Sequence, residues 1–272
     1  MYKRQFLEQY AEALASVGRT ADAKALLWPR LEKDESWALG CLRVAERLNS
    51  GEQEAWIALV EPILTKTAIN RIALGRVLYG AGTRAGNPAL FDRAIEVLRP
   101  ALDDQQTRVA AALYSAGAYE ARGNRTEAIS HYRIAIEKVP NDPTCLNNLA
   151  YLLSADEKTV AEAVKHAQHA VEIADKTVQS PELRRSFLET LGVCYFKNKQ
   201  YAEAEQAFRK ALTFDPDGLE ALVGLAETLD ALARPDEARS TMGRIDARPK
   251  TDISKDLQPR IDGLRTKLTA SK

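Results

Sequence analysis

Short amphipathic runs, with apolar residues three or four positions apart and charges between them, follow one another along the whole chain. One alanine recurs inside these runs, and the seven copies are called the spacer alanines below. They are Ala23, Ala55, Ala94, Ala128, Ala163, Ala204 and Ala238. The steps between them are 32, 39, 34, 35, 41 and 34 residues. A period of about 34 residues is typical of a repeated helix-turn-helix unit. The pattern therefore predicts an all-α solenoid of about seven antiparallel helix pairs.

The most regular copy of the repeat is the segment 188–216. Its characteristic positions are Leu191, Gly192 and Tyr195 in the first helix, Ala204, Phe208 and Ala211 in the second, and Pro216 at the end. These residues resemble the tetratricopeptide repeat (TPR) motif position by position. The segments 111–140 and 219–242 resemble it in the same way. The resemblance implies a right-handed superhelix whose first helices line a groove that holds a segment of a partner protein.

The repeated residue types have a packing reason. Two helices approach closely only where a small residue separates them, and a large residue one turn away fills the groove that results. Tyr132, Phe208 and Met242 each follow a spacer alanine by four positions. We therefore expect these three side chains to be buried.

Departures from the repeat divide the chain into three parts within one continuous solenoid. Residues 1–106 form degenerate repeats, because Pro29 and Pro62 interrupt the second helices of the first two copies. Residues 107–250 form the regular repeats. Residues 251–272 are predicted to form a C-terminal capping helix, with an apolar stripe that covers the open end. The stripe consists of Leu257, Ile261, Leu264 and Leu268. The excess residues in 80–92 and 174–184 are expected to form projecting loops.

Composition narrows the function classes. The chain has 38 basic and 38 acidic residues, so no overall field draws it to nucleic acid. No apolar stretch approaches the roughly 20 residues that cross a bilayer, so no membrane insertion is expected. Three isolated cysteines, Cys41, Cys145 and Cys194, indicate reduced core residues and favour the cytoplasm. The periplasm is the alternative if the chain is a fragment that lacks a leader, and the alanine-rich composition is typical of bacterial proteins.

No convincing site for chemistry emerges from the sequence. His166 and His169 lie three residues apart on a predicted helix without further ligands, so no metal is expected. The glycine-rich segment 80–86 follows a helix and lacks the lysine of a phosphate-binding loop, so no nucleotide cofactor is expected. The sequence predicts a protein without catalytic residues, metal or cofactor.

The resemblance implies which side chains of the first helices point into the groove. The candidate partner-binding residues are Asn147, Asn148, Tyr151, Glu189, Thr190, Phe196, Glu220, Glu227 and Asp230. Side-chain amides such as that of Asn148 both donate to and accept from a partner's backbone. The corresponding residues of the third copy are Ile69, Ile72, Ala73, Arg76 and Tyr79, and their apolar character favours a hydrophobic partner stripe or self-association.

The charge of the groove indicates the kind of partner. Of the basic and amide residues with which one TPR subclass grips a C-terminal carboxylate, only Asn148 is present. Glu189, Glu220, Glu227 and Asp230 instead favour a basic segment, unless lysines of other repeats pair with them. The leading hypothesis is a non-catalytic scaffold for a protein or peptide partner. The alternatives are the adaptor region of a longer enzyme or of an envelope or export complex subunit, and a self-associating structural protein.

Overall fold

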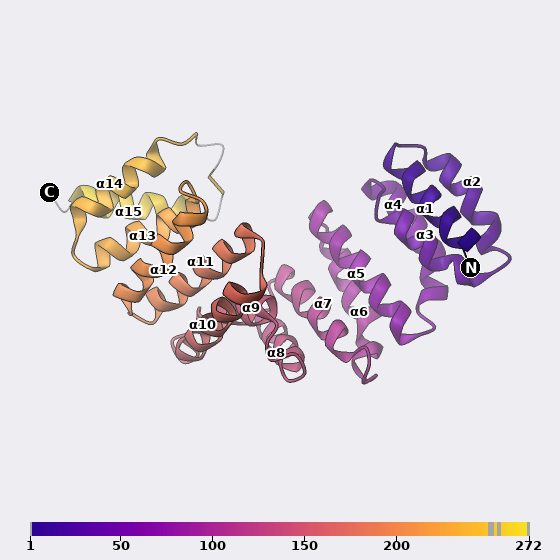
Figure 1. The fold of residues 1–272 in the computed structure, drawn as a ribbon, viewed down its shortest axis with the longest axis horizontal. Helices are drawn as coiled ribbons and strands as arrows, with labels where there is room; N and C mark the ends of the chain where they lie inside the picture. Colours follow the sequence, from indigo (N-terminus) through magenta and orange to yellow (C-terminus); the bar gives the residue numbers. More distant parts are fainter. Residues whose placement is uncertain (1, 250–252, 255–256, 271–272) are drawn as a thin grey trace. The chain divides into compact units, whose positions relative to one another are not determined.

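The computed structural model describes residues 2–249, 253–254 and 257–270. In this part of the chain it contains fifteen α-helices, two short 3-10 helices and no strands (Figure 1). None of its helices combines the length and the apolar character that a bilayer-spanning segment needs. The chain divides into two compact units, Met1–Lys138 and Val139–Lys272, which are described separately.

The N-terminal unit contains four helix pairs, α1/α2, α3/α4, α5/α6 and α7/α8. Their bounds are α1 Tyr2–Ser16, α2 Thr20–Leu31, α3 Ala38–Ala45, α4 Ser50–Leu64, α5 Ala68–Ala85, α6 Pro88–Leu98, α7 Arg108–Ala121 and α8 Arg125–Ile136. The 3-10 helices η1, Glu35–Trp37, and η2, Arg99–Leu102, connect successive pairs.

The C-terminal unit contains the pairs α9/α10, α11/α12 and α13/α14, followed by a single helix, α15. Their bounds are α9 Pro143–Leu153, α10 Val160–Thr177, α11 Pro181–Lys197, α12 Tyr201–Phe214, α13 Leu219–Ala231, α14 Pro235–Asp246 and α15 Gln258–Ala270. Seven pairs and a final helix confirm the predicted repeat architecture.

In both units the first helix of each pair packs on the first helix of the next. The contacts run α1–α3–α5–α7 in the N-terminal unit and α9–α11–α13–α15 in the C-terminal unit. Within each unit, a second helix packs on its partner and on the next first helix of the same unit, as α12 does on α11 and α13. The first helices therefore form one continuous layer in each unit, called the first-helix row below.

Six of the seven spacer alanines are completely buried, as the repeat pattern predicts; the exception is Ala55. That position was assigned wrongly, because Ala55 is exposed on α4. The N-cap of α4 is Asn49, and the residue four positions later is Gln53, which is 3% exposed. Its Nε2 donates to the carbonyl of Ala45 at 2.9 Å. A hydrogen-bonded glutamine thus occupies the spacer position of the second repeat.

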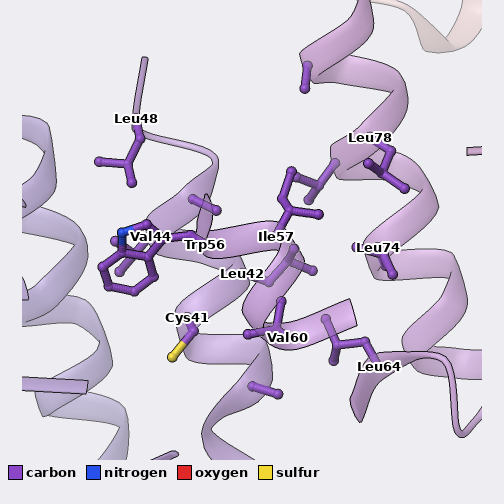
Figure 2. Close-up of a cluster of buried hydrophobic side chains, with 14 of the residues drawn as sticks. Cys41, Leu42, Val44, Leu48, Trp56, Ile57, Val60, Leu64, Leu74 and Leu78 are labelled. Carbon is purple, nitrogen blue, oxygen red and sulfur yellow. The ribbon is translucent and has the colours of Figure 1, made fainter. Parts of the chain in front are cut away.

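The degenerate copies also contain a buried apolar core. Around α4, the buried side chains of Trp56, Ile57 and Leu64 lie among residues of α3 and of α5 (Figure 2). Pro29 and Pro62 lie near the C-terminal ends of α2 and α4, and both helices continue past them. Each proline lacks the N–H that would bond the carbonyl four residues earlier, so each helix loses one backbone hydrogen bond without ending there.

The two predicted loops are wrong, since the excess residues lengthen helices. Residues 80–85 are the last turns of α5, and only Gly86 and Asn87 separate it from α6. Gly82 faces Phe91, where a β-carbon would come within 2.8 Å of the ring. Likewise α10 continues to Thr177, so that only residues 178–180 separate it from α11. Glycine was interpreted as flexible at a position where it permits close helix packing.

Five turns between paired helices share one backbone geometry. In each, one residue has a positive φ, and the next N–H donates to the carbonyl five residues earlier, as in a Schellman motif. The positive-φ residues are Gly18, Gly86, Gly123, Lys199 and Ala233. Three of the five are glycine, which adopts this conformation without steric cost, while Lys199 and Ala233 adopt it despite a β-carbon.

Ion pairs connect successive repeats across about thirty residues of sequence. Arg76 pairs with Glu46 at 2.6 Å, and Arg122 pairs with Asp92 at 2.8 Å. In the C-terminal unit, Arg234 of α14 pairs with Glu205 of α12, also at 2.6 Å. Such pairs are partly exposed, so each contributes less than about 1 kcal/mol.

Helix α15 covers the end of the C-terminal unit. Its apolar stripe, formed by Leu257 before the helix and by Ile261, Leu264 and Leu268, is buried against α13 and α14. The predicted capping role is therefore confirmed, while residues 251–252, 255–256 and 271–272 of that segment lie outside the described residues. The division of residues 1–250 at residue 106 was based on the regularity of the repeats and stays a prediction.

Candidate partner-binding groove

Two adjoining pockets lie along the first-helix row of the C-terminal unit. The first, called the Glu189 pocket, has a volume of about 380 Å³. It is lined by Tyr151 of α9, Ser186, Glu189, Thr190 and Val193 of α11, Phe208 of α12, Glu220 of α13, and Ser254, Leu257 and Arg260. The second, called the Lys267 pocket, has a volume of about 400 Å³. It is lined by Phe196, Tyr201, Glu227, Asp230, Ala231, Pro259, Arg260, Gly263, Leu264 and Lys267. Arg260 belongs to both pockets.

The predicted groove residues divide between these pockets. Four of them line the Glu189 pocket, namely Tyr151, Glu189, Thr190 and Glu220. Three line the Lys267 pocket, namely Phe196, Glu227 and Asp230. Positions on α9, α11 and α13 are therefore brought together, although they are up to 79 residues apart in sequence.

The two asparagines are placed differently. Asn147 is only 7% exposed, and its Nδ2 donates to Oδ1 of Asn148 at 3.3 Å. Neither residue is among those that line the two pockets. The amide oxygen of Asn147 is buried and accepts no hydrogen bond within the described residues. A role for this pair in gripping a partner's backbone stays a prediction.

Two of the four groove acids are neutralised by α15. Arg260 Nε donates to Glu227 Oε1 at 3.0 Å, and Lys267 Nζ pairs with Asp230. The alternative in which lysines pair with the acids therefore holds for Asp230, while Glu227 is paired with an arginine of the capping helix. These pairs reduce the negative potential of the Lys267 pocket, so the expectation of an acidic groove does not extend to it.

The acidic groups of the Glu189 pocket are paired less closely with bases than those of the Lys267 pocket. Glu189 Oε1 lies 3.9 Å from Arg185 Nε, beyond hydrogen-bond distance, while Arg185 Nη1 contacts Asp215 at 2.7 Å. Burial raises the pKa of Glu189 to about 7; Arg185 opposes this rise, and Glu220 and Asp215 add to it. Neither a salt bridge nor a hydrogen bond of the Glu220 carboxylate occurs within the described part of the chain. Negative charge in this pocket is thus carried by Glu220, and by Glu189 once the pH exceeds about 7.

The contribution of α15 to the groove was not predicted. Its apolar stripe identified the helix as a cap, but Arg260 and Lys267 were left out of the site. These two residues are seven apart, so they lie on the same face of a helix two turns apart. A cap that packs on α13 as a further first helix turns this basic face toward the groove acids. The seven-residue spacing was the signal available in the sequence.

The residues of the apolar set of the third repeat differ in exposure and in contacts. Ile69 is 65% exposed at the start of α5, whereas Ile72 and Ala73 are half-buried. Arg76 pairs with Glu46, and the ring of Tyr79 packs 6.0 Å from that of Phe91. Self-association through this surface stays a prediction.

The described residues contain no group of three or more His, Cys, Asp or Glu side chains that could hold a metal ion. His166 Nε2 lies 3.5 Å from Glu162 on the same helix. The three cysteines are buried free thiols, and desolvation raises the pKa of each to about 12, which disfavours the reactive thiolate.

Sequence comparison identifies the family. Three models described as tetratricopeptide repeat match residues 109–152, 143–217 and 195–267, which together cover more than half of the chain. The chain is a tetratricopeptide repeat protein. No curated protein matches its sequence.

Solved structures show the same fold at low sequence identity. A tetratricopeptide repeat protein from Parabacteroides merdae is 14% identical, with a TM-score of 0.59 over 100% of this chain and 87% of that chain. PilF of Pseudomonas aeruginosa is 21% identical, with a TM-score of 0.56 over 75% and 83%. YrrB, described as a TPR protein with an unusual peptide-binding site, is 16% identical, with a TM-score of 0.58 over 74% and 92%. These similarities support the TPR fold of this chain.

Proposed function

We propose that this TPR protein is a non-catalytic scaffold that holds a segment of a partner protein along the first-helix row of its C-terminal unit. The observation that carries the proposal is the pair of adjoining pockets, which join side chains from α9, α11, α13 and α15 into one continuous lining. TPR folds act in protein–protein interaction. YrrB, which is similar in fold, is described as having a peptide-binding site.

The bound segment is basic in this proposal. Glu189 and Glu220 lie in one pocket, and the bases near them, Arg185 and Arg260, are already paired with Asp215 and Glu227. Electrostatic complementarity of this kind selects partners and accelerates their association, and salt screens it. The exposed ring of Tyr151, at 55%, adds an apolar surface on which a partner side chain packs.

The test uses three fluorescent peptides of equal length and identical apolar positions, whose variable positions carry lysine and arginine, glutamine, or glutamate. We expect the basic peptide to bind at least about tenfold more tightly than the acidic one, and its affinity to fall as sodium chloride is added. Preference for the acidic peptide, or equal binding of all three at every salt concentration, would contradict the proposal.

A pair of variants locates the binding surface. Ser186→Arg places a cation in the Glu189 pocket, whereas Gln206→Arg adds the same charge at an exposed position of α12 outside both pockets. We expect Ser186→Arg to weaken binding of the basic peptide about tenfold and Gln206→Arg to leave it nearly unchanged. Equal effects of the two variants would place the binding surface elsewhere.

A further inference from the structure

The Glu189 pocket contains polar groups whose hydrogen-bonding capacity is not used within the protein. Glu189 Oε1 is buried without a hydrogen-bond partner in the described residues. Thr190, beside it, is only 8% exposed, and its hydroxyl neither donates nor accepts a hydrogen bond in the part of the chain that the structure describes. Buried polar groups are normally paired, so the buried, unpaired carboxylate oxygen of Glu189, with the free Thr190 hydroxyl in the same pocket, indicates a site for an external donor.

The charges around the pocket identify the kind of donor. Arg185 of α11 is paired with Asp215, which precedes α13, and Arg260 of α15 is paired with Glu227 of α13. After these pairings, the carboxylates of Glu189 and Glu220 remain. The remaining ionisable side chain that lines the pocket is the phenol of Tyr151, from α9. A cation in this pocket would therefore meet the carboxylate of Glu220, which has no ion pair in the described residues, and that of Glu189, whose ion pair with Arg185 Nε is long, at 3.9 Å.

The pocket also has apolar walls. Val193, Phe208 and Leu257 line it together with the acids, and Tyr151 contributes an exposed aromatic ring at its edge. Aliphatic stems of long basic side chains pack on such surfaces, while a guanidinium group stacks on an aromatic ring.

We infer that the Glu189 pocket is a binding subsite for one arginine side chain of the bound segment, an inference that rests on the proposed function. The guanidinium donates to Glu189 Oε1, to the Glu220 carboxylate and to the Thr190 hydroxyl. Its five N–H groups serve several acceptors at once, which favours arginine over lysine. Tyr151 packs on the guanidinium, and the apolar walls contact the methylene stem.

The ionisation of Glu189 gives this subsite a pH dependence. Burial and the nearby Glu220 and Asp215 raise the pKa of Glu189 to about 7, with Arg185 opposing them. A bound guanidinium favours the ionised carboxylate, so binding releases a proton when the pH is below about 7. Affinity for arginine should therefore rise with pH up to about 7 and level off above it.

The experiment uses the whole chain and two small probes, N-acetyl-arginine amide and N-acetyl-citrulline amide, which differ in charge but hardly in shape. Amide chemical shifts of Thr190 and Val193 are followed by NMR as each probe is added at millimolar concentration. We expect a saturable response to the arginine probe at pH 8, at least about tenfold weaker binding of the citrulline probe, and weaker arginine binding at pH 6. Equal responses to the two probes would overturn the inference.

Three charge-neutralising variants assign the effect to residues. Glu189→Gln and Glu220→Gln should each weaken binding of the arginine probe about tenfold, and Glu189→Gln should also remove the pH dependence. Glu157→Gln, at an exposed site outside both pockets, is the matched control and should change neither. Because Glu220 is exposed, its variant keeps the test valid even if Glu189→Gln alters the packing. Unchanged binding in Glu220→Gln would overturn the inference.

The outcomes separate this inference from the proposed function. If the basic peptide binds wild type and both pocket variants equally, the arginine subsite is wrong and the groove proposal stands. If the arginine probe binds with the expected discrimination while no peptide binds, the subsite is supported and the groove proposal is wrong.

Discussion

The ring of Phe208 on α12 lies against the backbone of Gly192 on α11, where a β-carbon would come within 2.6 Å of ring carbon Cε1. The same ring contacts Gly224 of α13. Phe208 is only 1% exposed, so the two glycines create the space that it fills between three helices. The characteristic glycine of the repeat thus reflects contact with this aromatic side chain.

Truncation of Phe208 to alanine should lower the free energy of unfolding by about 3–5 kcal/mol, because it removes a completely buried ring and leaves a cavity. Urea denaturation followed by circular dichroism measures the loss. Phe214→Ala is the control. Because Phe214 is only half-buried, its truncation should lower the free energy of unfolding by less. An unfolding curve that matches wild type would mean that Phe208 does not fill this space.

Gly192→Ala should destabilise the protein by about 1–3 kcal/mol, since the added methyl group displaces the ring of Phe208. The cost should be smaller in a Phe208→Leu background, where the smaller side chain leaves room. A double-mutant cycle measures this coupling. Additive effects of the two substitutions would exclude the contact as the cause.

Most of the fold could be predicted because each repeat carries its own packing signal. The burial of Ala128, Ala204 and Ala238 follows from small residues at a fixed distance from the helix start. The second repeat was misassigned because Gln53 satisfies its polar group on Ala45, a contact between helices that sequence spacing does not reveal. The lengthened α5 was missed because glycine is as compatible with close helix packing as with a turn.

The turns between paired helices offer a test that involves no packing. Ala233→Gly and Lys199→Gly should each stabilise the protein by about 0.5–1 kcal/mol, because both residues have a positive φ that disfavours a β-carbon. Gly123→Ala, at the corresponding turn of another repeat, should destabilise it by about 1 kcal/mol. Thermal unfolding should show a higher melting temperature for the two variants that introduce glycine and a lower one for Gly123→Ala. A shift in the same direction for all three variants would refute the prediction.

The raised pKa of Glu189 predicts a pH-dependent loss of stability. The native state holds this proton more tightly than the unfolded state, in which the pKa is near 4.5. The unfavourable contribution is therefore absent below about pH 4.5, grows as the pH rises, and is complete above about pH 7. Its full size is of the order of 1–3 kcal/mol, after allowance for partial exposure.

Glu189→Gln should remove this contribution, so the variant should be more stable than wild type at pH 8 and nearly equal to it at pH 5. Urea denaturation of both proteins at the two pH values measures the difference, with Glu157→Gln as a control for the loss of one charge. A difference that does not change with pH would show that Glu189 ionises normally.

Zinc and ATP should leave the melting temperature unchanged. A ligand that binds only the native state raises the melting temperature. The described residues contain no cluster of three metal-ligating side chains to which zinc could bind. Thermal scans with and without each compound measure the effect. A rise of several degrees with either one would reveal a site that neither the sequence nor the geometry indicates.

The groove was predictable in outline but not in charge. Tyr151, Glu189 and Glu220 line one pocket, as positions on first helices of the repeat suggest. Which acids remain without a base depends on where α15 places Arg260 and Lys267, and that follows from the packing of the cap on α13. The periodicity of a single helix cannot show which acids are paired, since the pairing depends on how two helices are oriented relative to each other.

The ion pairs between successive repeats bear on cooperativity rather than on the stability of any one helix pair. Three of them are Arg76–Glu46, Arg122–Asp92 and Arg234–Glu205. Each joins two repeats, so these pairs contribute to the interaction energy between neighbouring repeats of the linear array. Salt screens such exposed pairs but leaves the apolar packing within each repeat largely intact. Rising ionic strength should therefore broaden the unfolding transition, as repeats begin to unfold less in concert with their neighbours.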